Sequence, residues 1–397
     1  MDSATTEQLK KEVMDALKRG NPAEAFDKVQ KCLDDLDDTP LNIAITGESG
    51  SGKSTFINAI RGIGDEDPSS AKTGVVETTM VPTPYSHPKY KSVIFWDLPG
   101  LGSPNFKAKE YLDKVDFQHY DFFVIMASER FKENHIMLAE SIQCMNKQFY
   151  FVRSKVDRDV NESRMRRPKY FNENTLLDTI SQDCVNSLKT AGTIDPYVFL
   201  VSSFQPQDFD FSLLLKTFEE QLPTHKRYVY LRALPNISSE AIAMKVQALT
   251  TAVPLIALKV AIASIVPGYV QYSECSTLTS YIREYVESFG LDDNSLDDLA
   301  QRSHKSLIHL KSLVKSPFVK YEITYDLVWK ELRKRNSTDF TTAKTIISWV
   351  PVLSVFAGAM SAMTCAAFLF SAMNELAEDA KTVLEVAFGC SDHTWLG

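Results

Sequence analysis

The chain has 397 residues, which is enough for two or three domains with a sizeable core. Its hydrophobic share of 44% and charged share of 24% are those of an ordinary globular protein. The formal net charge of −8 argues against nucleic acid as the main partner, because binding to that polymer depends on Lys and Arg placed on phosphates.

The cysteines and the amino-terminal residues bear on the compartment. Six cysteines are scattered without a C-x-x-C pair, so we expect reduced thiols in a cytosolic protein. Residues 1–40 are charged and lack the apolar core of a secretory signal. The sequence does not begin Met-Gly, so we expect no N-myristoylation.

The first predicted elements are two amphipathic helices within residues 5–37. Apolar residues recur at helical spacing on both sides of Gly20-Asn21-Pro22, which breaks the pattern. We place residues 1–38 outside the nucleotide-binding domain, as a helical segment that packs with the C-terminal helical domain.

A phosphate-binding loop follows the strand predicted at 41–46 and precedes a helix predicted at 55–61. The loop fits the pattern G-x-x-x-x-G-K-[ST], and glycines there allow φ > 0 and close approach of phosphate. We expect Lys53 to reach the β- and γ-phosphates and Ser54 to bind Mg²⁺. The residues predicted to bind the nucleotide here are Gly47, Glu48, Ser49, Gly50, Ser51, Gly52, Lys53, Ser54 and Thr55.

A polar, glycine-containing segment at 71–79 is predicted to act as a switch. One of its threonines should bind Mg²⁺ while the γ-phosphate is present and release it after hydrolysis. We favour Thr73, with Thr79 as the second choice. The alternative is that both threonines only cap turns.

The strand predicted at 92–96 ends in the motif Asp97-Leu98-Pro99-Gly100. An acid at this place can hold Mg²⁺ through water, and the Gly100 N–H can bond the γ-phosphate. The next residue is Leu101, where small signalling GTPases carry a glutamine that orients the attacking water. We therefore expect slow hydrolysis, or a catalytic group supplied by another loop or another subunit.

Two later strands predict the base-binding loops. After a strand at 121–126, the strand at 149–153 delivers Ser154-Lys155-Val156-Asp157, a guanine motif with Ser in place of Asn or Thr. Asp157 can accept from the ring N–H and exocyclic amine of guanine, which predicts GTP rather than ATP. The last strand, 198–201, leads to Ser202 and Ser203, where a backbone N–H would meet the guanine carbonyl.

Strands that alternate with helices predict an α/β P-loop domain, with a mostly parallel sheet covered by helices on both faces. We place this G domain at 39–224 and an all-α domain at 225–397. Helical patterns are predicted at 238–266, 274–289 and 295–316. The uncharged stretch Ile346–Met373 is long enough to cross a bilayer, and two alternatives stay open, membrane insertion or a buried central helix.

The motifs together resemble the immunity-related GTPases, an interferon-inducible, dynamin-like family. The resemblance covers roughly residues 10–390 and rests on the phosphate loop, the segment at 71–79, the motif at Asp97–Gly100, the guanine motif and Ser288–Leu296. Lys53 places the chain with the family's GKS branch.

The resemblance implies binding of GTP and GDP, self-assembly through the G domains and a cell-autonomous immune role at membranes. It also implies a cytoplasmic protein that attaches peripherally to intracellular membranes. The residues that match the family's assembly contact are Glu77, Thr79, Arg130 and Lys132. With these, the expected catalytic residues are Lys53, Thr73, Glu77 and Gly100, and the expected Mg²⁺ ligands are Ser54, Thr73 and Asp97.

The sequence thus predicts a Mg²⁺-dependent GTPase whose nucleotide cycle drives assembly. A nucleotide-gated binding module with little turnover is the alternative, because Leu101 removes a familiar catalytic group. An ATP-dependent P-loop enzyme would have to bind ATP tightly despite Asp157.

Overall fold

The computed structural model describes residues 3–74, 81–101, 108–190, 192–193, 196–263, 274–335 and 359–389. The chain divides into two compact units. The nucleotide unit comprises Thr39–Leu222 and Ala233–Ile237, and the helical unit comprises Met1–Asp38, Pro223–Arg232 and Ser238–Gly397. The predicted boundary after residue 224 lies just beyond Leu222, and the return of 233–237 to the nucleotide unit was not foreseen.

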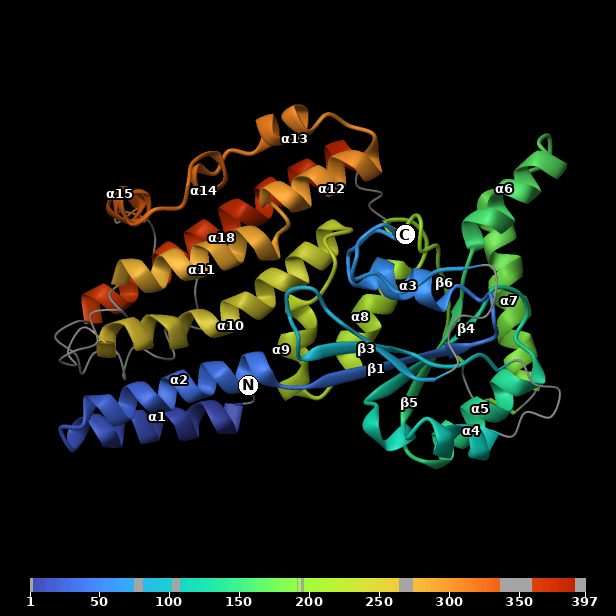
Figure 1. Cartoon of the computed structure of the whole chain (residues 1–397), viewed down its shortest axis with the longest axis horizontal. Coiled ribbons are helices and arrows are strands. Elements are labelled where there is room, and N and C mark those ends of the chain that lie inside the picture. The colour runs from blue at the N-terminus through green and yellow to red at the C-terminus, as the bar shows by residue number, and fades with distance from the viewer. Residues whose placement is uncertain are drawn as a thin grey trace. The chain divides into compact units, whose positions relative to one another are not determined.

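A six-stranded sheet forms the centre of the nucleotide unit, in the order β2-β3-β1-β4-β5-β6. Strands β1, β3, β4, β5 and β6 are labelled in Figure 1. Its neighbours run parallel except for β2, which is antiparallel to β3. The strands are β1 (Leu41–Gly47), β2 (Thr83–Ser86), β3 (Val93–Asp97), β4 (Phe122–Ala127), β5 (Gln148–Arg153) and β6 (Val198–Leu200). The predicted α/β fold with a mostly parallel sheet is confirmed.

Helices cover both faces of this sheet. One apolar cluster joins β4 and β5 to α4 (Ala108–Lys114), α5 (Glu133–Cys144) and α7 (Glu173–Thr190). On the other face, Phe218 of α8 (Phe211–Gln221) packs on Phe122 with ring centroids 4.8 Å apart, and Phe56 of α3 (Lys53–Ile60) packs on Phe211 at 5.5 Å. The described part of the unit also contains η1 (Phe117–His119) and α6 (Val156–Arg166).

Burial explains which strands the sequence revealed. Every residue of β1 and β4 is buried, as expected for central parallel strands that helices cover on both faces. The edge strand β2, by contrast, has no fully buried residue and contains Pro84. A short strand that is half exposed and interrupted by proline gives no strand pattern, so the sequence missed it.

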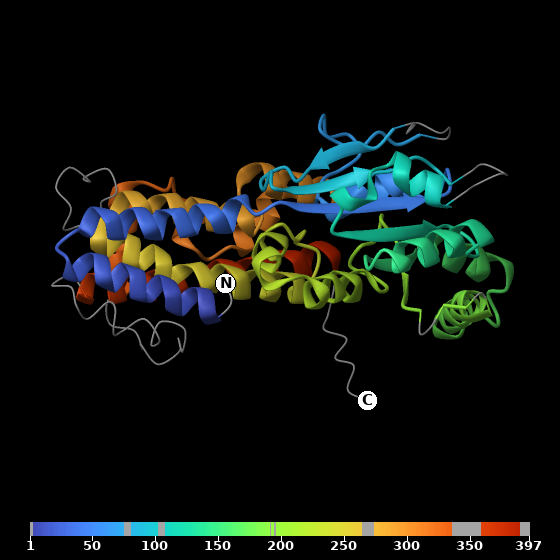
Figure 2. The same ribbon diagram turned by 90° about the horizontal axis from the view of Figure 1, so that it is seen from below.

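The helical unit contains α1 (Ser3–Lys18) and α2 (Pro22–Asp38), an antiparallel hairpin drawn in blue in Figure 2. Gly20, at φ 75°, and Pro22, at the first position of α2, separate the two helices where the pattern predicted. Among the residues that the structure describes, the other helices of this unit are α9 (Thr224–Arg232), α10 (Ser239–Ala263), α11 (Glu274–Ser288), α12 (Asp293–Ser303), α13 (Leu307–Leu313), α14 (Pro317–Lys320), α15 (Tyr325–Arg335) and α18 (Ala359–Phe388).

One helix prediction in this unit is wrong. The stretch 295–316 was expected to be a single amphipathic helix, but α12 ends at Ser303 and α13 begins at Leu307. His304 between them has φ 54°, in the left-handed region, and so ends α12. Histidine is not a typical helix-ending residue, and the sequence pattern therefore gave no sign of the break.

The long apolar helices pack on each other. α10 contacts α18 and α2, and most of the apolar part of α10 is buried. Within the residues that the structure describes, α10 is the one helix that is long and apolar enough to cross a membrane. Of the stretch Ile346–Met373, residues 346–358 lie outside the described residues, and the rest belongs to α18.

Candidate nucleotide-binding site

The phosphate loop joins the end of β1 to the start of α3, as the motif predicted. Gly52 caps α3 at φ 88°, a conformation that favours glycine. A Cβ atom on Gly47 would lie 2.2 Å from the carbonyl oxygen of Met126, so any larger residue would push β1 and β4 apart. The loop therefore wraps the amino end of α3 with its backbone close to the neighbouring strand.

Two buried side chains of the loop are suited to an anion. The Lys53 amine, in a residue only 8% exposed, donates to the carbonyl oxygens of Gly47 (3.2 Å) and Glu48 (3.0 Å). The Ser51 hydroxyl is buried and has no hydrogen-bond partner among the described residues. A cation held by neutral carbonyls, next to an unsatisfied donor and a helix amino terminus, fits phosphate oxygens. Ser49 and Gly50 are exposed on the loop, and Thr55 follows in the first turn of α3.

Two of the expected Mg²⁺ ligands, one at the start of α3 and one at the end of β3, face each other. Ser54 donates its hydroxyl to the Asp97 carboxylate at 2.7 Å, and Asp97 is 1% exposed at the end of β3. The parallel pairing of Ile45 with Asp97 brings this acid level with the end of β1. A hydroxyl and a carboxylate in this arrangement are the oxygen donors that Mg²⁺ prefers, so the residues fit the ion.

The residue after the Asp97–Gly100 motif points away from this site. Leu101 is fully buried in the apolar cluster under β4, α4 and α5. Its N–H donates to the carbonyl of Gly47 (3.2 Å), and its own carbonyl accepts from Asn134 (3.1 Å). Gly100 is partly buried beside it. The side chain at position 101 thus belongs to the core and cannot orient water at a phosphate.

The predicted switch segment is placed only in part. Thr73 is exposed and, among the residues that the structure describes, makes no hydrogen bond to Ser54 or Asp97. Glu77 and Thr79 lie outside the described residues.

The guanine motif is anchored to the phosphate loop. The Ser154 hydroxyl donates to the carbonyl of Ser51 at 2.6 Å, and the Lys155 amine donates to the carbonyl of Gly50 at 2.7 Å. Asp157, partly exposed, lies in the first turn of α6. The serine that departs from the usual Asn or Thr therefore joins the two loops.

The last predicted base-binding residues follow β6 at the same edge of the sheet, since β5 and β6 are parallel. Ser202 is fully buried, and its hydroxyl accepts from the N–H of Gln205 at 3.1 Å. Ser203 is partly buried.

The basic residues expected at an assembly contact are exposed and form ion pairs within the subunit. Arg130 pairs with Asp183 at 3.0 Å, and Lys132 pairs with Glu48 of the phosphate loop at 2.7 Å. The hydrogen bond that Lys132 donates to the Glu48 carboxylate raises the pKa of Lys132. His135 accepts the Lys132 N–H at 3.1 Å, and its burial lowers the pKa of the imidazole, which keeps it neutral at the start of α5.

Sequence reasoning missed two positioning side chains. The Tyr111 hydroxyl donates to the carbonyl of Pro99 (2.9 Å) and lies 2.9 Å from the Thr46 hydroxyl, so it joins the Asp97–Gly100 motif to the end of β1. Arg153 contacts the guanine motif from the end of β5. Both residues lie outside the known motifs, and nothing in their sequence spacing marks them.

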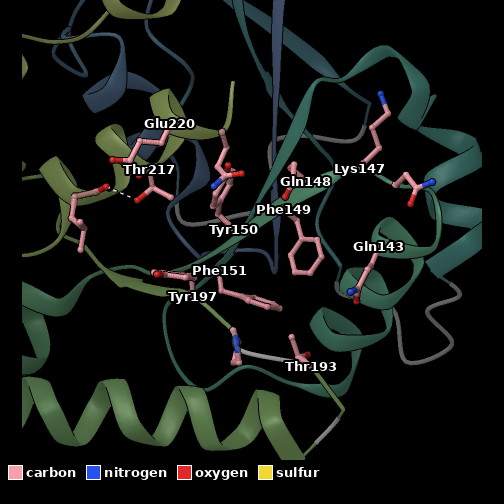
Figure 3. A pocket seen from close by; sticks show the side chains of 14 residues that line it. Gln143, Lys147, Gln148, Phe149, Tyr150, Phe151, Thr193, Tyr197, Thr217 and Glu220 are labelled. Carbon is pink, nitrogen blue, oxygen red and sulfur yellow. Dashed lines mark hydrogen bonds between the residues drawn. The ribbon is translucent and has the colours of Figure 1, made fainter. Parts of the chain in front are cut away.

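A cavity of about 540 Å³ lies elsewhere in the unit, at the amino-terminal part of β5 (Figure 3). Gln148, Phe149, Thr193 and Tyr197 are among its lining residues. None of the predicted nucleotide-binding residues lines it, because those residues follow the carboxyl ends of the strands.

Comparison with known proteins supports the same chemistry. The family model described as "Interferon-inducible GTPase (IIGP)" matches residues 6–387. The chain is 40% identical over 389 residues to "Interferon-inducible GTPase 5" of Bos taurus, covering 96% of this chain and 83% of that protein. It is 42% identical over 314 residues to "Interferon-gamma-inducible GTPase 10" of Mus musculus, covering 78% and 75% of the two chains.

Proposed function

Because the chain belongs to the interferon-inducible GTPase family, and is therefore a GTP-hydrolysing protein, we propose that a second copy of the chain completes its catalytic site. The observation that carries this proposal is the burial of Leu101. This position would have to carry a glutamine to orient the attacking water, but its side chain is a leucine that lies in the apolar core. The GTP-dependent contact between two copies would then control hydrolysis.

Within one subunit, the residues divide the work of binding. The Lys53 amine would leave its carbonyl partners for the β- and γ-phosphate oxygens, and the buried Ser51 hydroxyl would donate to phosphate. Mg²⁺, when bound, neutralises charge that develops on the phosphates. Ser54 and Asp97 would hold the ion, the latter through water, and Thr73 is the proposed switch ligand.

The surface beside the phosphate loop is suited to a second copy. Glu48 and Lys132 form an ion pair there, and Arg130 is 80% exposed in its own pair with Asp183. Exposed ion pairs contribute little to stability, so they can exchange partners at low cost. We propose that Glu77, Thr79, Arg130 and Lys132 form the contact, and that Arg130 or Lys132 brings positive charge to the γ-phosphate of the other copy.

We further propose that the assembled protein acts at intracellular membranes in cell-autonomous immunity. The relatives' names describe induction by interferon, which supports the immune part of the proposal. The apolar part of α10 is mostly buried against other helices, which supports peripheral attachment rather than a spanning helix.

The alternative is a nucleotide-gated binding module with slow turnover. The buried Leu101 side chain favours this alternative if no second copy supplies a water-orienting group. Measurements of assembly and of the hydrolysis rate distinguish the two functions.

Light scattering with size separation tests the proposal. The wild type should be monomeric with GDP and form dimers or larger species with a non-hydrolysable GTP analogue. The variant Arg130→Ala/Lys132→Ala should bind both nucleotides but stay monomeric, and Arg158→Ala, an exposed arginine outside the proposed contact, should behave as the wild type. A wild type that stays monomeric with the analogue at all protein concentrations would contradict the proposal.

A further inference from the structure

Arg153 is a buried arginine at the last position of β5, directly before the guanine motif. It is 7% exposed, so its charge is largely removed from water. Burying a guanidinium costs free energy unless its N–H groups are hydrogen-bonded. The groups that accept these hydrogen bonds therefore indicate the structural role of Arg153.

The Arg153 guanidinium contacts three different segments. One terminal nitrogen, Nη1, donates to the carbonyl of Ser128, which follows β4, and to the carbonyl of Ser154 at 2.8 Å. The other, Nη2, donates to the Asp159 carboxylate in the first turn of α6 at 2.6 Å. The planar fork therefore ties the end of β4, the guanine motif and the start of α6 into one unit.

The turn that it braces is short and conformationally unusual. Only Ser154 and Lys155 separate β5 from α6, and Lys155 has φ 59°, in the left-handed region that a lysine rarely adopts. Such a conformation persists where the surroundings hold it in place. The base-reading Asp157 is the second residue of α6, so the angle at which α6 leaves this turn sets the position of its carboxylate.

The turn is held from two sides. On one side, Ser154 and Lys155 bond to the phosphate loop. On the other side, the apolar face of α6 packs through Val156 and Val160. The Arg153 contact to Asp159 adds a polar restraint on the same turn, two residues from Asp157.

We propose that Arg153 and Asp159 form a clamp that positions Asp157 and thereby sets the preference for guanine. Arg153 is a positioning residue, since its guanidinium donates to the Ser128 and Ser154 carbonyls and to the Asp159 carboxylate. The proposal rests on guanine-nucleotide binding by this site and is independent of self-assembly.

If Arg153 and Asp159 position Asp157, their loss should change the discrimination between bases. If they only stabilise the fold, their loss should weaken binding of every nucleotide alike. A well-placed Asp157 accepts from both the ring N–H and the exocyclic amine of guanine. Hypoxanthine keeps the ring N–H but lacks the amine. Misplacing Asp157 should therefore weaken binding of GDP more than binding of IDP, whereas damage to the phosphate loop should weaken both nucleotides equally.

The experiment measures dissociation constants of GDP and IDP by fluorescence competition in the full-length protein. We expect Arg153→Met to lower the ratio of the IDP constant to the GDP constant by about tenfold, the size of one hydrogen bond to a charged acceptor. Asp159→Leu removes only one of the three contacts, since leucine has no acceptor, and should lower the ratio by a smaller factor. The double variant should equal Arg153→Met, because the two residues act through one interaction.

Arg158→Met is the matched control, since Arg158 lies on the same helix in an exposed pair with Glu162. This variant should keep the wild-type ratio. The proposal is overturned if Arg153→Met and Asp159→Leu lose affinity for both nucleotides equally. If Arg153→Met does not fold, an unchanged ratio in Asp159→Leu is enough to overturn it, and so is a wild type that binds GDP well but does not prefer it to IDP.

Discussion

A buried basic side chain in the nucleotide unit and one in the helical unit differ in their hydrogen-bond partners. Lys53 of the phosphate loop donates to the neutral carbonyls of Gly47 and Glu48. Arg232 of α9 lies between the carboxylates of Asp37 and Glu284, which come from α2 and α11. The two carbonyl partners of Lys53 belong to the phosphate loop, where an anion would bind, whereas carboxylates from two helices neutralise Arg232 and make it part of the scaffold.

The largest effect expected from this comparison is on the stability of the helical unit. Arg232→Met should lower the free energy of unfolding by about 3–5 kcal/mol, because it leaves two carboxylates without their shared cation. Urea unfolding followed by circular dichroism measures the loss. Arg19→Met is the control, since Arg19 forms an exposed pair with Glu24, and it should cost less than about 1 kcal/mol. A loss no larger than that of the control would show that Arg232 is not a structural cation.

Lys53→Met should reduce nucleotide affinity without reducing the stability of the fold, the reverse of what is expected for Arg232→Met. We expect the affinity for GTP to fall by about 100-fold, which corresponds to ~2.7 kcal/mol, because a charged donor to the phosphates is removed. The free energy of unfolding without nucleotide should stay the same or rise, since a buried charge is lost. Fluorescent-nucleotide titration and urea unfolding measure the two quantities, with the exposed Lys11→Met as control. A variant that binds GTP normally would refute the assignment of Lys53.

The smallest effect expected is a dependence on pH in the helical unit. Burial raises the pKa of Glu284, although Arg232 opposes the shift, and burial likewise raises the pKa of Asp37. A carboxyl group with a raised pKa in the folded state binds protons more tightly there than in the unfolded state. Its stabilising contribution is therefore present below its ordinary value, 4.5 for Glu284, and is lost as the pH rises through the folded-state pKa.

The variant Glu284→Gln isolates this contribution. Its free energy of unfolding, relative to the wild type, should fall as the pH is lowered from neutral towards 4.5, because the wild type gains stability on protonation and the amide does not. Thermal or urea unfolding at a series of pH values measures the difference. A difference that is constant, or that grows at acidic pH, would contradict the raised pKa.

The same comparison shows what the sequence could and could not predict. The parallel sheet and the backbone of the phosphate loop were predictable, because buried strands are apolar and only glycine suits Gly52 at φ 88°. The break at His304 was not, because a residue that seldom ends helices adopts the left-handed conformation there.

Long-range polar contacts were also hidden. Glu48 and Lys132 are 84 residues apart, and Arg232 and Asp37 are 195 apart, so no local pattern connects them. The positions of Arg153 and Tyr111 likewise depend on which loops the sheet brings together. The nucleotide-binding motifs therefore predicted which residues form the loops of the site, but they did not predict which side chains hold these loops in place.

The most direct test of the account is the rate of GTP hydrolysis per molecule, measured over a wide range of protein concentration. The wild type should gain specific activity as concentration rises, and Glu77→Ala and Arg130→Ala/Lys132→Ala should remove that gain while they keep nucleotide affinity. Ser54→Asn, which disturbs the proposed Mg²⁺ site, should abolish turnover at every concentration. A specific activity that stays constant with concentration in the wild type would contradict the claim that a second copy completes the site.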